Sequence, residues 1–327
     1  MRLVNRLLPV VAAMLLAFSI AVAQTAPAQN YPTKPIRIIV GFTAGGGNDI
    51  LARLVGQKLS ESLHQPVIVE NKPGAGAMIA TEYVAKAAPD GYTLLMGASG
   101  AMTINPAVYT KISYDTLRDF KPISMIASFP LFLVVNPSLP ITSVGELVTY
   151  VKANPQKANY AASSAAFQLA TELFKLKTGA PMEYIAYKGS NDSVMAVIAG
   201  EVLLTIADAT PVSGQLQAGQ VRALAVTSEK RNAAFPDVPT MAEAGVPEMN
   251  VELWSGFFAP AGTPAPILDK LQDEVVRIVR LPDIRDRMKA LAVDPAGKGS
   301  DEFARVIASD ITRWAAVAQA SHVKIER

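Results

Sequence analysis

The sequence contains no cysteine and only two histidines, and both shortages narrow the possible functions. Without cysteine there is no disulfide framework and no acylated-cysteine membrane anchor. His64 and His322 are far apart in the sequence, and neither belongs to an HExxH motif or lies beside a carboxylate cluster. We therefore expect no metal site and no cofactor.

The chain also has little net charge. Removing Arg2 and Arg6, which lie in the N-terminal segment described next, leaves 28 Lys and Arg residues against 28 Asp and Glu residues. Binding to nucleic acid leaves a basic footprint on a protein surface. Because that footprint is missing, we expect no nucleic-acid partner.

Residues 1–23 have the features of a secretory signal peptide. Arg2 and Arg6 precede an apolar run from Leu7 to about Val22, and small residues precede Gln24. An uncleaved membrane anchor is the alternative, but the run is short for a membrane span. We expect export and cleavage near Ala23.

The stretch 36–63 predicts a strand, a glycine loop and a helix. Ile36–Val40 is a short β-branched run, typical of a buried strand, and it stops at Gly41. Asn48 or Asp49, directly after three glycines, can act as the helix N-cap. The apolar residues of the helix recur every four positions: Leu51, Val55, Leu59 and Leu63.

This strand–loop–helix junction favours an anion, because unpaired backbone N–H groups and the positive end of the helix dipole meet there. An ordinary βα turn without a ligand is equally consistent with the pattern. Gly47 and Asn48 stand where a P-loop needs Lys and Ser or Thr, and the glycine spacing is not G-x-G-x-x-G. We therefore predict a small carboxylate or oxyanion at this loop rather than a nucleotide.

Two further loops of the same kind follow. Pro66 to Glu70 is a predicted strand that ends before the glycines of PGAG, and Tyr92 to Met96 is a predicted strand that ends before GASG. Loops of one kind after successive strands argue for a parallel sheet whose strand ends line a crevice.

A second α/β series starts with a predicted strand near Leu131. Ser143 and Glu146 form a capping box that opens a helix to Lys152. After about residue 260 we predict helices and no new strand, so the tail should return to cover the first unit. The last long helix should be capped by Ser300 or Asp301.

The predicted mature chain exceeds the usual size of one hydrophobic core, so we expect two lobes. The predicted division is a signal peptide at 1–23, lobe 1 at 24–130 and 252–327, and lobe 2 at 131–251. The chain would cross between the lobes near 129–135 and 251–258. Two such crossings suit hinge closure on a ligand.

Over nearly its whole predicted mature length the chain resembles the extracytoplasmic solute receptors of tripartite tricarboxylate transporters, the Bug receptors. The resemblance rests on motifs that occur in order: YPTKPIRIIVGFTAGGGNDILAR, VIVENKPGAGAMIA, APDGYTLLMGASG, YKGSNDSV, GQVRALAVTSEKR, FPDVPTMAEAGVP and WSGFFAPAGTP. It implies a periplasmic Venus-flytrap fold without catalysis. Such a receptor captures a small mono- or dicarboxylate and delivers it to membrane permease subunits, and we expect it to be a monomer.

The resemblance also implies which residues bind the ligand. From lobe 1 these are Phe42, Thr43, Ala44, Gly45, Gly46, Asp49 and Ser99, and from lobe 2 they are Ser163, Ser164, Tyr187, Lys188, Gly189 and Asp208. The segment ASSAAFQLA departs from the family, because relatives often have a longer, glycine-containing loop there. Ligand identity is therefore the property that transfers least well from relatives.

Several of these residues also have ordinary structural explanations. Asp49 and the serines can cap helices, and capping is the role we predict for Asp49. Lys188 can be solvated in a polar loop, and Trp254 should pack in a crossing strand.

Two other functions are consistent with parts of the pattern. A receptor that signals to a membrane sensor would share this fold and this pocket. A periplasmic hydrolase using Ser163 or Ser164 would need a nearby base, and the sequence has no G-x-S-x-G elbow.

Overall fold

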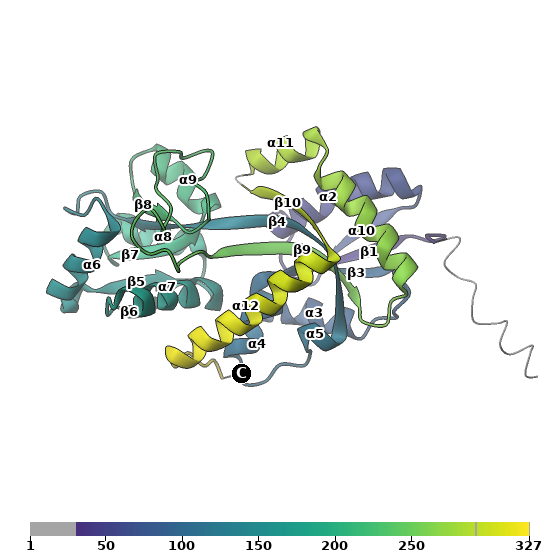
Figure 1. Cartoon of the computed structure of the whole chain (residues 1–327), viewed down its shortest axis with the longest axis horizontal. Coiled ribbons are helices and arrows are strands. Elements are labelled where there is room, and N and C mark those ends of the chain that lie inside the picture. The colour runs from purple at the N-terminus through teal and green to yellow at the C-terminus, as the bar shows by residue number, and fades with distance from the viewer. Residues whose placement is uncertain (1–30, 292, 327) are drawn as a thin grey trace, which may run out of the picture.

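The computed structural model describes residues 31–291 and 293–326, which form two α/β lobes joined by two long strands (Figure 1). The joining strands are β4 (Phe120–Val135) and β9 (Glu252–Pro260). The predicted fold class, a two-lobed binding-protein fold with two crossing segments, is confirmed. The predicted lobe boundaries fall on these strands and stay a prediction, and the predicted signal peptide lies outside the described residues.

The first lobe is built on parallel strands, as predicted. Strand β1 pairs in parallel with β2 and β3, and β3 then pairs antiparallel with β9. The elements are β1 (Ile36–Val40), α2 (Gly47–Leu63), β2 (Val67–Asn71), η2 (Ala75–Ala77), α3 (Met78–Ala85), β3 (Thr93–Ala98), η3 (Gly100–Ile104), α4 (Asn105–Val108), α5 (Thr116–Asp119), α10 (Ala265–Val279), α11 (Pro282–Ala290), β10 (Asp294–Gly299) and α12 (Ser300–Ala320).

The second lobe continues the same sheet along the second half of β4. Strands β7 and β8 pair antiparallel with β4, and β5 pairs in parallel with β6 and β7. The elements are α6 (Val144–Ala153), η4 (Pro155–Lys157), β5 (Asn159–Ala162), α7 (Ala165–Thr178), β6 (Glu183–Ala186), α8 (Ser190–Ala199), β7 (Leu204–Asp208), α9 (Ala209–Gln217) and β8 (Arg222–Val226). The capping box before α6 is confirmed, because Glu146 N donates to Ser143 Oγ at 3.2 Å.

The prediction that a new strand starts near Leu131 is wrong, because β4 is one strand of 16 residues. Pro122 and Pro130 lie inside it, and proline normally argues against a central strand. The register between β4 and β9 shifts just after Pro122, so a β-bulge accommodates that proline.

The tail also contains a strand that the sequence does not predict. Strand β10 has the sequence DPAGKG, with no β-branched residue, yet it pairs antiparallel with β4. Its extended form therefore comes from tertiary pairing rather than from local propensity. The predicted cap of the last helix is also wrong, because the N-cap of α12 is Gly299 without a side-chain hydrogen bond.

The strand register places the loop-bearing ends of the two lobes opposite each other. On the lobe 1 side Ala98, the last residue of β3, aligns through Ser255 with Ala127 of β4. On the lobe 2 side Asp208, the last residue of β7, aligns with Leu131 of β4. These two points are four residues apart on β4, or roughly 13 Å at 3.3 Å per residue. The loops after the parallel strands therefore face one another across the middle of β4.

The helices seal both faces of the sheet. The predicted apolar face of α2 is buried, with Leu51, Val55 and Leu59 each fully inaccessible, and each such side chain contributes about 1.5–3 kcal/mol of hydrophobic stabilisation. On the other face α3 and α12 cover β3 and β9.

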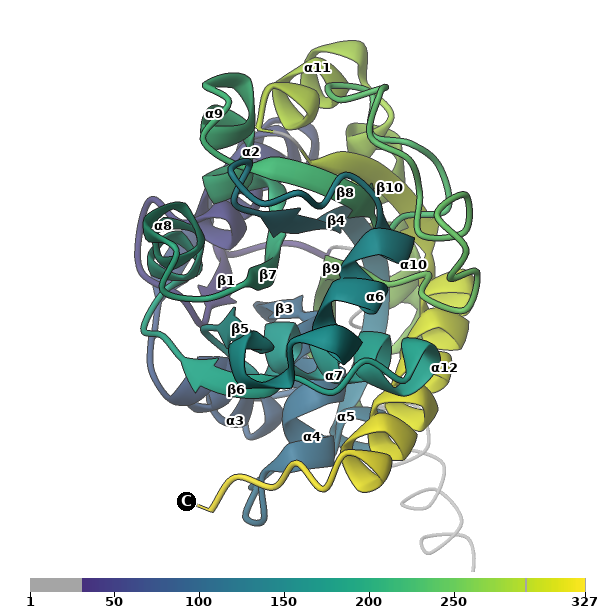
Figure 2. The same cartoon turned by 90° about the vertical axis from the view of Figure 1, so that its left-hand side faces the viewer.

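Helix α12 joins the two lobes a third time. Its residues Trp314 and Val317 lie in the same apolar cluster as Leu169 and Phe174 of α7. In the end-on view of Figure 2, α12 runs along the side of the molecule opposite α8. A hinge movement about β4 and β9 would therefore have to change the packing of α7 against α12.

Candidate ligand-binding site

The loop between β1 and α2 begins with a close backbone approach. A Cβ on Gly41 would lie 2.4 Å from Ala77 Cβ, so only glycine lets the loop 74–77 pack against this position. That loop is itself unusual, because Ala75, Gly76 and Ala77 all have left-handed φ angles. Asn105 Nδ2 holds it by donating to Gly76 O at 2.9 Å. The left-handed conformation raises the free energy of an alanine by roughly 1–2 kcal/mol per residue, so tertiary contacts must hold Ala75 and Ala77 in it.

Helix α2 starts two or three residues earlier than predicted, because neither Asn48 nor Asp49 is its N-cap. Gly46 is the N-cap and makes no side-chain cap hydrogen bond. Asp49 lies inside the first turn, and its Oδ2 accepts a hydrogen bond from Gly45 N at 2.9 Å. The carboxylate therefore folds the glycine loop back over the helix start instead of capping the helix.

Asp49 is held by two further side chains. Arg53 Nε lies 3.1 Å and 3.0 Å from the two Asp49 oxygens, and Asn71 Nδ2 donates to Asp49 Oδ1 at 2.9 Å. Asn71 Nδ2 also donates to Phe42 O at 3.0 Å, which ties β2 to the loop. The hydrogen bonds from Arg53, with those from Gly45 and Asn71, lower the pKa of Asp49 to about 2. Arg53 is thus paired with Asp49, and its side chain is 52% exposed.

We expect the wild-type protein to lose about 2 kcal/mol of stability, from Asp49 alone, as the pH falls from about 4 to about 2. The pKa of Asp49 is lower in the folded than in the unfolded protein, so its contribution is fully present above the unfolded pKa and disappears on protonation. Urea unfolding at several pH values measures this slope. The variant Asp49→Asn should lack that part of the slope, and an unchanged slope would contradict the assignment.

Two of the glycine N–H groups in the loop already have hydrogen-bond acceptors, so they are not free to bind an anion. Gly45 N is bound by Asp49, and Gly46 N donates to Thr43 O at 3.3 Å. The backbone N–H groups of the first turn of α2, from Gly47 to Asp49, have no acceptor among the described residues, because the first bond back along the helix comes from Ile50 N to Gly46 O. The free donors available to the predicted anion are therefore those of the first turn of α2 rather than those of the loop alone.

Ser99 has a structural partner in this structure. It is 1% exposed, and its Oγ accepts a hydrogen bond from Trp254 N at 3.1 Å. Trp254 is also buried, as predicted, and its Nε1 donates to Asp310 at 2.7 Å. Ser99 thereby fastens the GASG loop to the crossing strand β9, and its contact with a ligand stays a prediction.

The predicted lobe 2 residues come together at the ends of β5, β6 and β7. Ser164 is the exposed N-cap of α7, and neither its hydroxyl nor that of Ser163 has a hydrogen-bond partner among the described residues. Both hydroxyls are therefore available to a ligand, and neither is activated by a base. Gly189 is the N-cap of α8, and Lys188 beside it is exposed.

Tyr187 and Asp208 already have partners within lobe 2. The Tyr187 hydroxyl donates to Glu201 Oε2 at 3.1 Å. Asp208 Oδ1 accepts from Ser190 Oγ at 2.6 Å, and burial raises the pKa of this carboxyl. Asp208 thus joins the loop after β6 to the end of β7, and the ligand-reading roles predicted for both residues are untested.

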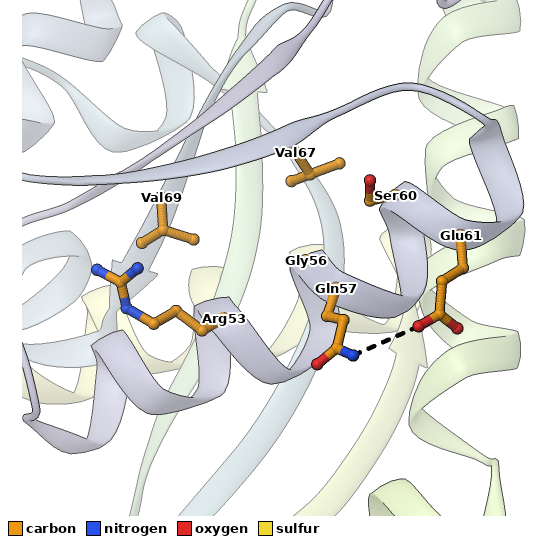
Figure 3. A pocket seen from close by; sticks show the side chains of 7 residues that line it. All are labelled: Arg53, Gly56, Gln57, Ser60, Glu61, Val67 and Val69. Atoms are coloured by element: carbon orange, nitrogen blue, oxygen red, sulfur yellow. Dashed lines mark hydrogen bonds between the residues drawn. The ribbon is translucent and has the colours of Figure 1, made fainter.

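Two surface hollows lie away from these residues. One of about 500 Å³ lies between α2 and the edge strand β2, where Gly56 has no side chain (Figure 3). Its lining is Arg53, Gly56, Gln57, Ser60, Glu61, Val67 and Val69. A second, of about 420 Å³, lies between α10 and Gly299. Neither hollow is lined by a predicted ligand residue.

The described residues contain neither a candidate metal site nor a candidate membrane span. No group of three His, Asp or Glu side chains in the described chain could hold a metal ion. Within residues 31–291 and 293–326, no helix combines the length and apolarity that a bilayer crossing requires.

Comparison with known proteins gives the family. The model of the tripartite tricarboxylate transporter family receptor matches residues 51–323. The chain belongs to this family. Its members are periplasmic solute-binding receptors, a non-enzymatic class.

Individual relatives match over most of their length. Protein BugT of Bordetella pertussis is 37% identical over 308 residues, which cover 93% of this chain and 94% of BugT. The solved structure of Rpa4515 of R. palustris with adipate is 35% identical, has a TM-score of 0.79, and is matched over 91% of this chain and 100% of that one. MatC of Rhodopseudomonas palustris with bound malate is 30% identical, with a TM-score of 0.74, over 88% of this chain and 99% of that one.

Proposed function

We propose that this receptor captures a small mono- or dicarboxylate between its lobes and delivers it to the membrane permease of a tripartite tricarboxylate transporter. The main support is the first turn of α2, where free backbone N–H groups and the helix dipole meet at the end of β1. Relatives solved with adipate and with malate show that related proteins hold dicarboxylates.

In the proposed complex each lobe binds a different end of the ligand. In lobe 1 one carboxylate binds to N–H donors without a dedicated arginine, because the nearby Arg53 is paired with Asp49. In lobe 2 the hydroxyls of Ser163 and Ser164 and the exposed Lys188 read the other end of the ligand. Closure about β4 and β9 brings the two halves together, and small-angle scattering should show compaction when ligand is added.

The test is calorimetry on the mature chain, refolded so that carried-over ligand is removed. The panel consists of adipate, malate and acetate, each compared with the matching amide. We expect at least one acid to bind and its amide to bind at least about 10-fold more weakly, because a charge-assisted hydrogen bond is worth about 1.5–3 kcal/mol. Equal binding of acid and amide would overturn the proposal.

Lys188→Ala should weaken binding of a dicarboxylate by about 1–3 kcal/mol and leave acetate binding nearly unchanged. The matched control is Lys157→Ala, because exposed Lys157 lies in η4 before β5, at the opposite end of that strand from Ser163. If both lysine variants lose the same affinity, the effect is long-range charge rather than a contact.

A further inference from the structure

The crossing strand β9 carries a buried hydroxyl, that of Ser255, at the end of the paired strand β3. Ser255 lies on β9 and aligns with Ala98 of β3 on one side and with Ala127 of β4 on the other. Its residue surface is 1% exposed. The hydroxyl therefore sits at the level where β3 ends.

This hydroxyl binds the first turn of α2. Ser255 Oγ donates a hydrogen bond to Asn48 Oδ1, across 207 positions of sequence. Asn48 is the second residue of α2, directly beside the free N–H groups of Gly47 and Asp49. The Asn48 amide is therefore oriented with its oxygen, which accepts this hydrogen bond, toward Ser255 and with its nitrogen away from Ser255.

The other end of the amide must then face solvent. Asn48 Nδ2 has no acceptor among the described residues, and within the described chain every fully buried side-chain nitrogen or oxygen has a partner. Since Nδ2 has no partner, it is not one of the buried atoms. An N–H₂ group is thus presented to water at the first turn of α2.

We propose that Asn48 is a ligand-binding residue whose Nδ2 donates to the ligand carboxylate, and that Ser255 is the positioning residue that orients it. This inference rests on the proposed function, because it assigns the carboxylate to the same helix start. An amide nitrogen here adds a side-chain donor to the backbone donors without adding charge. That explains how the site holds an anion although the arginine nearby is paired with Asp49.

The same strand holds a second site element. One residue before Ser255, Trp254 N donates to Ser99 Oγ, so the GASG loop and the first turn of α2 are both fastened to β9. The donors in lobe 1 therefore keep a fixed geometry relative to the strand that crosses to lobe 2. A ligand bound by Asn48 would be connected to β9 through the hydrogen bond between Asn48 and Ser255.

The experiment combines calorimetry with NMR on the ¹⁵N-labelled protein, using the acid of the adipate, malate and acetate panel that binds best. Asn48→Asp keeps the oxygen that Ser255 needs but removes the N–H₂ donor and adds a negative charge. We expect it to weaken binding at least about 100-fold, and Asn48→Ala about 10-fold or more. In the wild-type spectrum, the Asn48 side-chain amide signal, identified by its absence in Asn48→Asp, should shift in proportion to ligand occupancy.

Ser255→Ala separates positioning from contact. It should weaken binding about 5-fold in the wild-type background and have no further effect in Asn48→Ala, because it acts only through that amide. Ser124→Ala is the matched control, since it removes another fully buried hydroxyl, which donates to Lys298 O on β10. It should leave binding unchanged.

The outcomes distinguish this inference from the proposed function. If the wild-type protein binds no acid on the panel, the proposed function fails and the inference fails with it. If the wild-type protein binds but the Asn48 amide signal does not move and Asn48→Asp binds normally, only the inference is overturned. If Ser255→Ala lowers ligand affinity equally in the wild-type and Asn48→Ala backgrounds, the positioning role of Ser255 is overturned.

Discussion

Replacing Trp254 by phenylalanine should destabilise the folded protein by about 3 kcal/mol, one of the two largest effects that we expect. The indole Nε1 donates to Asp310 at 2.7 Å, and both residues are buried. Phenylalanine fills much of the ring volume but leaves a buried carboxylate without its main donor. Arg313, at 3.5 Å from Asp310, lies on the same helix and replaces only part of that interaction.

The other tryptophan provides a matched control. Trp314 is also buried on α12, but its indole N–H makes no hydrogen bond to the described residues, so Trp314→Phe should cost clearly less stability. Adding Asp310→Asn to Trp254→Phe should recover stability, because the group left without a donor is then neutral. Urea unfolding of the single and double variants measures both effects, and equal losses for the two tryptophans would contradict the explanation.

The loss of folding stability caused by Trp254→Phe should also depend on pH. Burial raises the pKa of Asp310, while the hydrogen bond from Trp254 lowers it. Removing that bond raises the folded-state pKa further, so the variant loses stability relative to wild type as the pH rises through the raised pKa. The stability difference between the two proteins should therefore be smaller at low pH, where the Asp310 carboxyl is protonated in both, than at high pH, where it is ionised in both.

Sequence reasoning succeeded where one short segment contains the whole signal. The strand Ile36–Val40 has the predicted bounds, and the buried face of α2 is the predicted one, because β-branched runs and four-residue spacing are local properties. The capping box at Ser143 is local in the same way.

It failed where distant pairing decides the structure. Strand β4 continues through two prolines because it pairs with β9, β10, β7 and β8 along its length. Strand β10 is extended because it pairs with β4. Local propensity opposes both strands, so the sequence predicts a strand that begins only near Leu131 and no strand after about residue 260.

The candidate site shows the same limit. The glycine loop and the helix start are visible in the sequence, but the partners that occupy their groups are not. Gly45 N donates to the Asp49 carboxylate, Trp254 N donates to Ser99 Oγ, and Ser255 Oγ donates to the Asn48 amide oxygen. The last two contacts join residues 155 and 207 positions apart, which no local pattern contains.

Gly46→Val should weaken carboxylate binding about 100-fold or more, equivalent to about 3 kcal/mol. Gly46 is the N-cap of α2, and its extended backbone is compatible with any residue, so the helix should still form. A Cβ at this position would already lie 3.3 Å from Thr43 O, and the branched side chain would stand beside the free N–H groups of Gly47 and its neighbours. The bulk should keep the ligand from approaching donors that only a bare backbone leaves open.

The control is Gly145→Val, because Gly145 lies in the first turn of α6, where a Cβ meets nothing within 4 Å. It introduces the same side chain at another helix start and should leave binding unchanged. Calorimetry with the best-binding acid and urea unfolding should be run on both variants, so that lost binding is separated from lost stability. A Gly46→Val protein that is as stable as Gly145→Val and binds like the wild type would place the carboxylate elsewhere than at the start of α2.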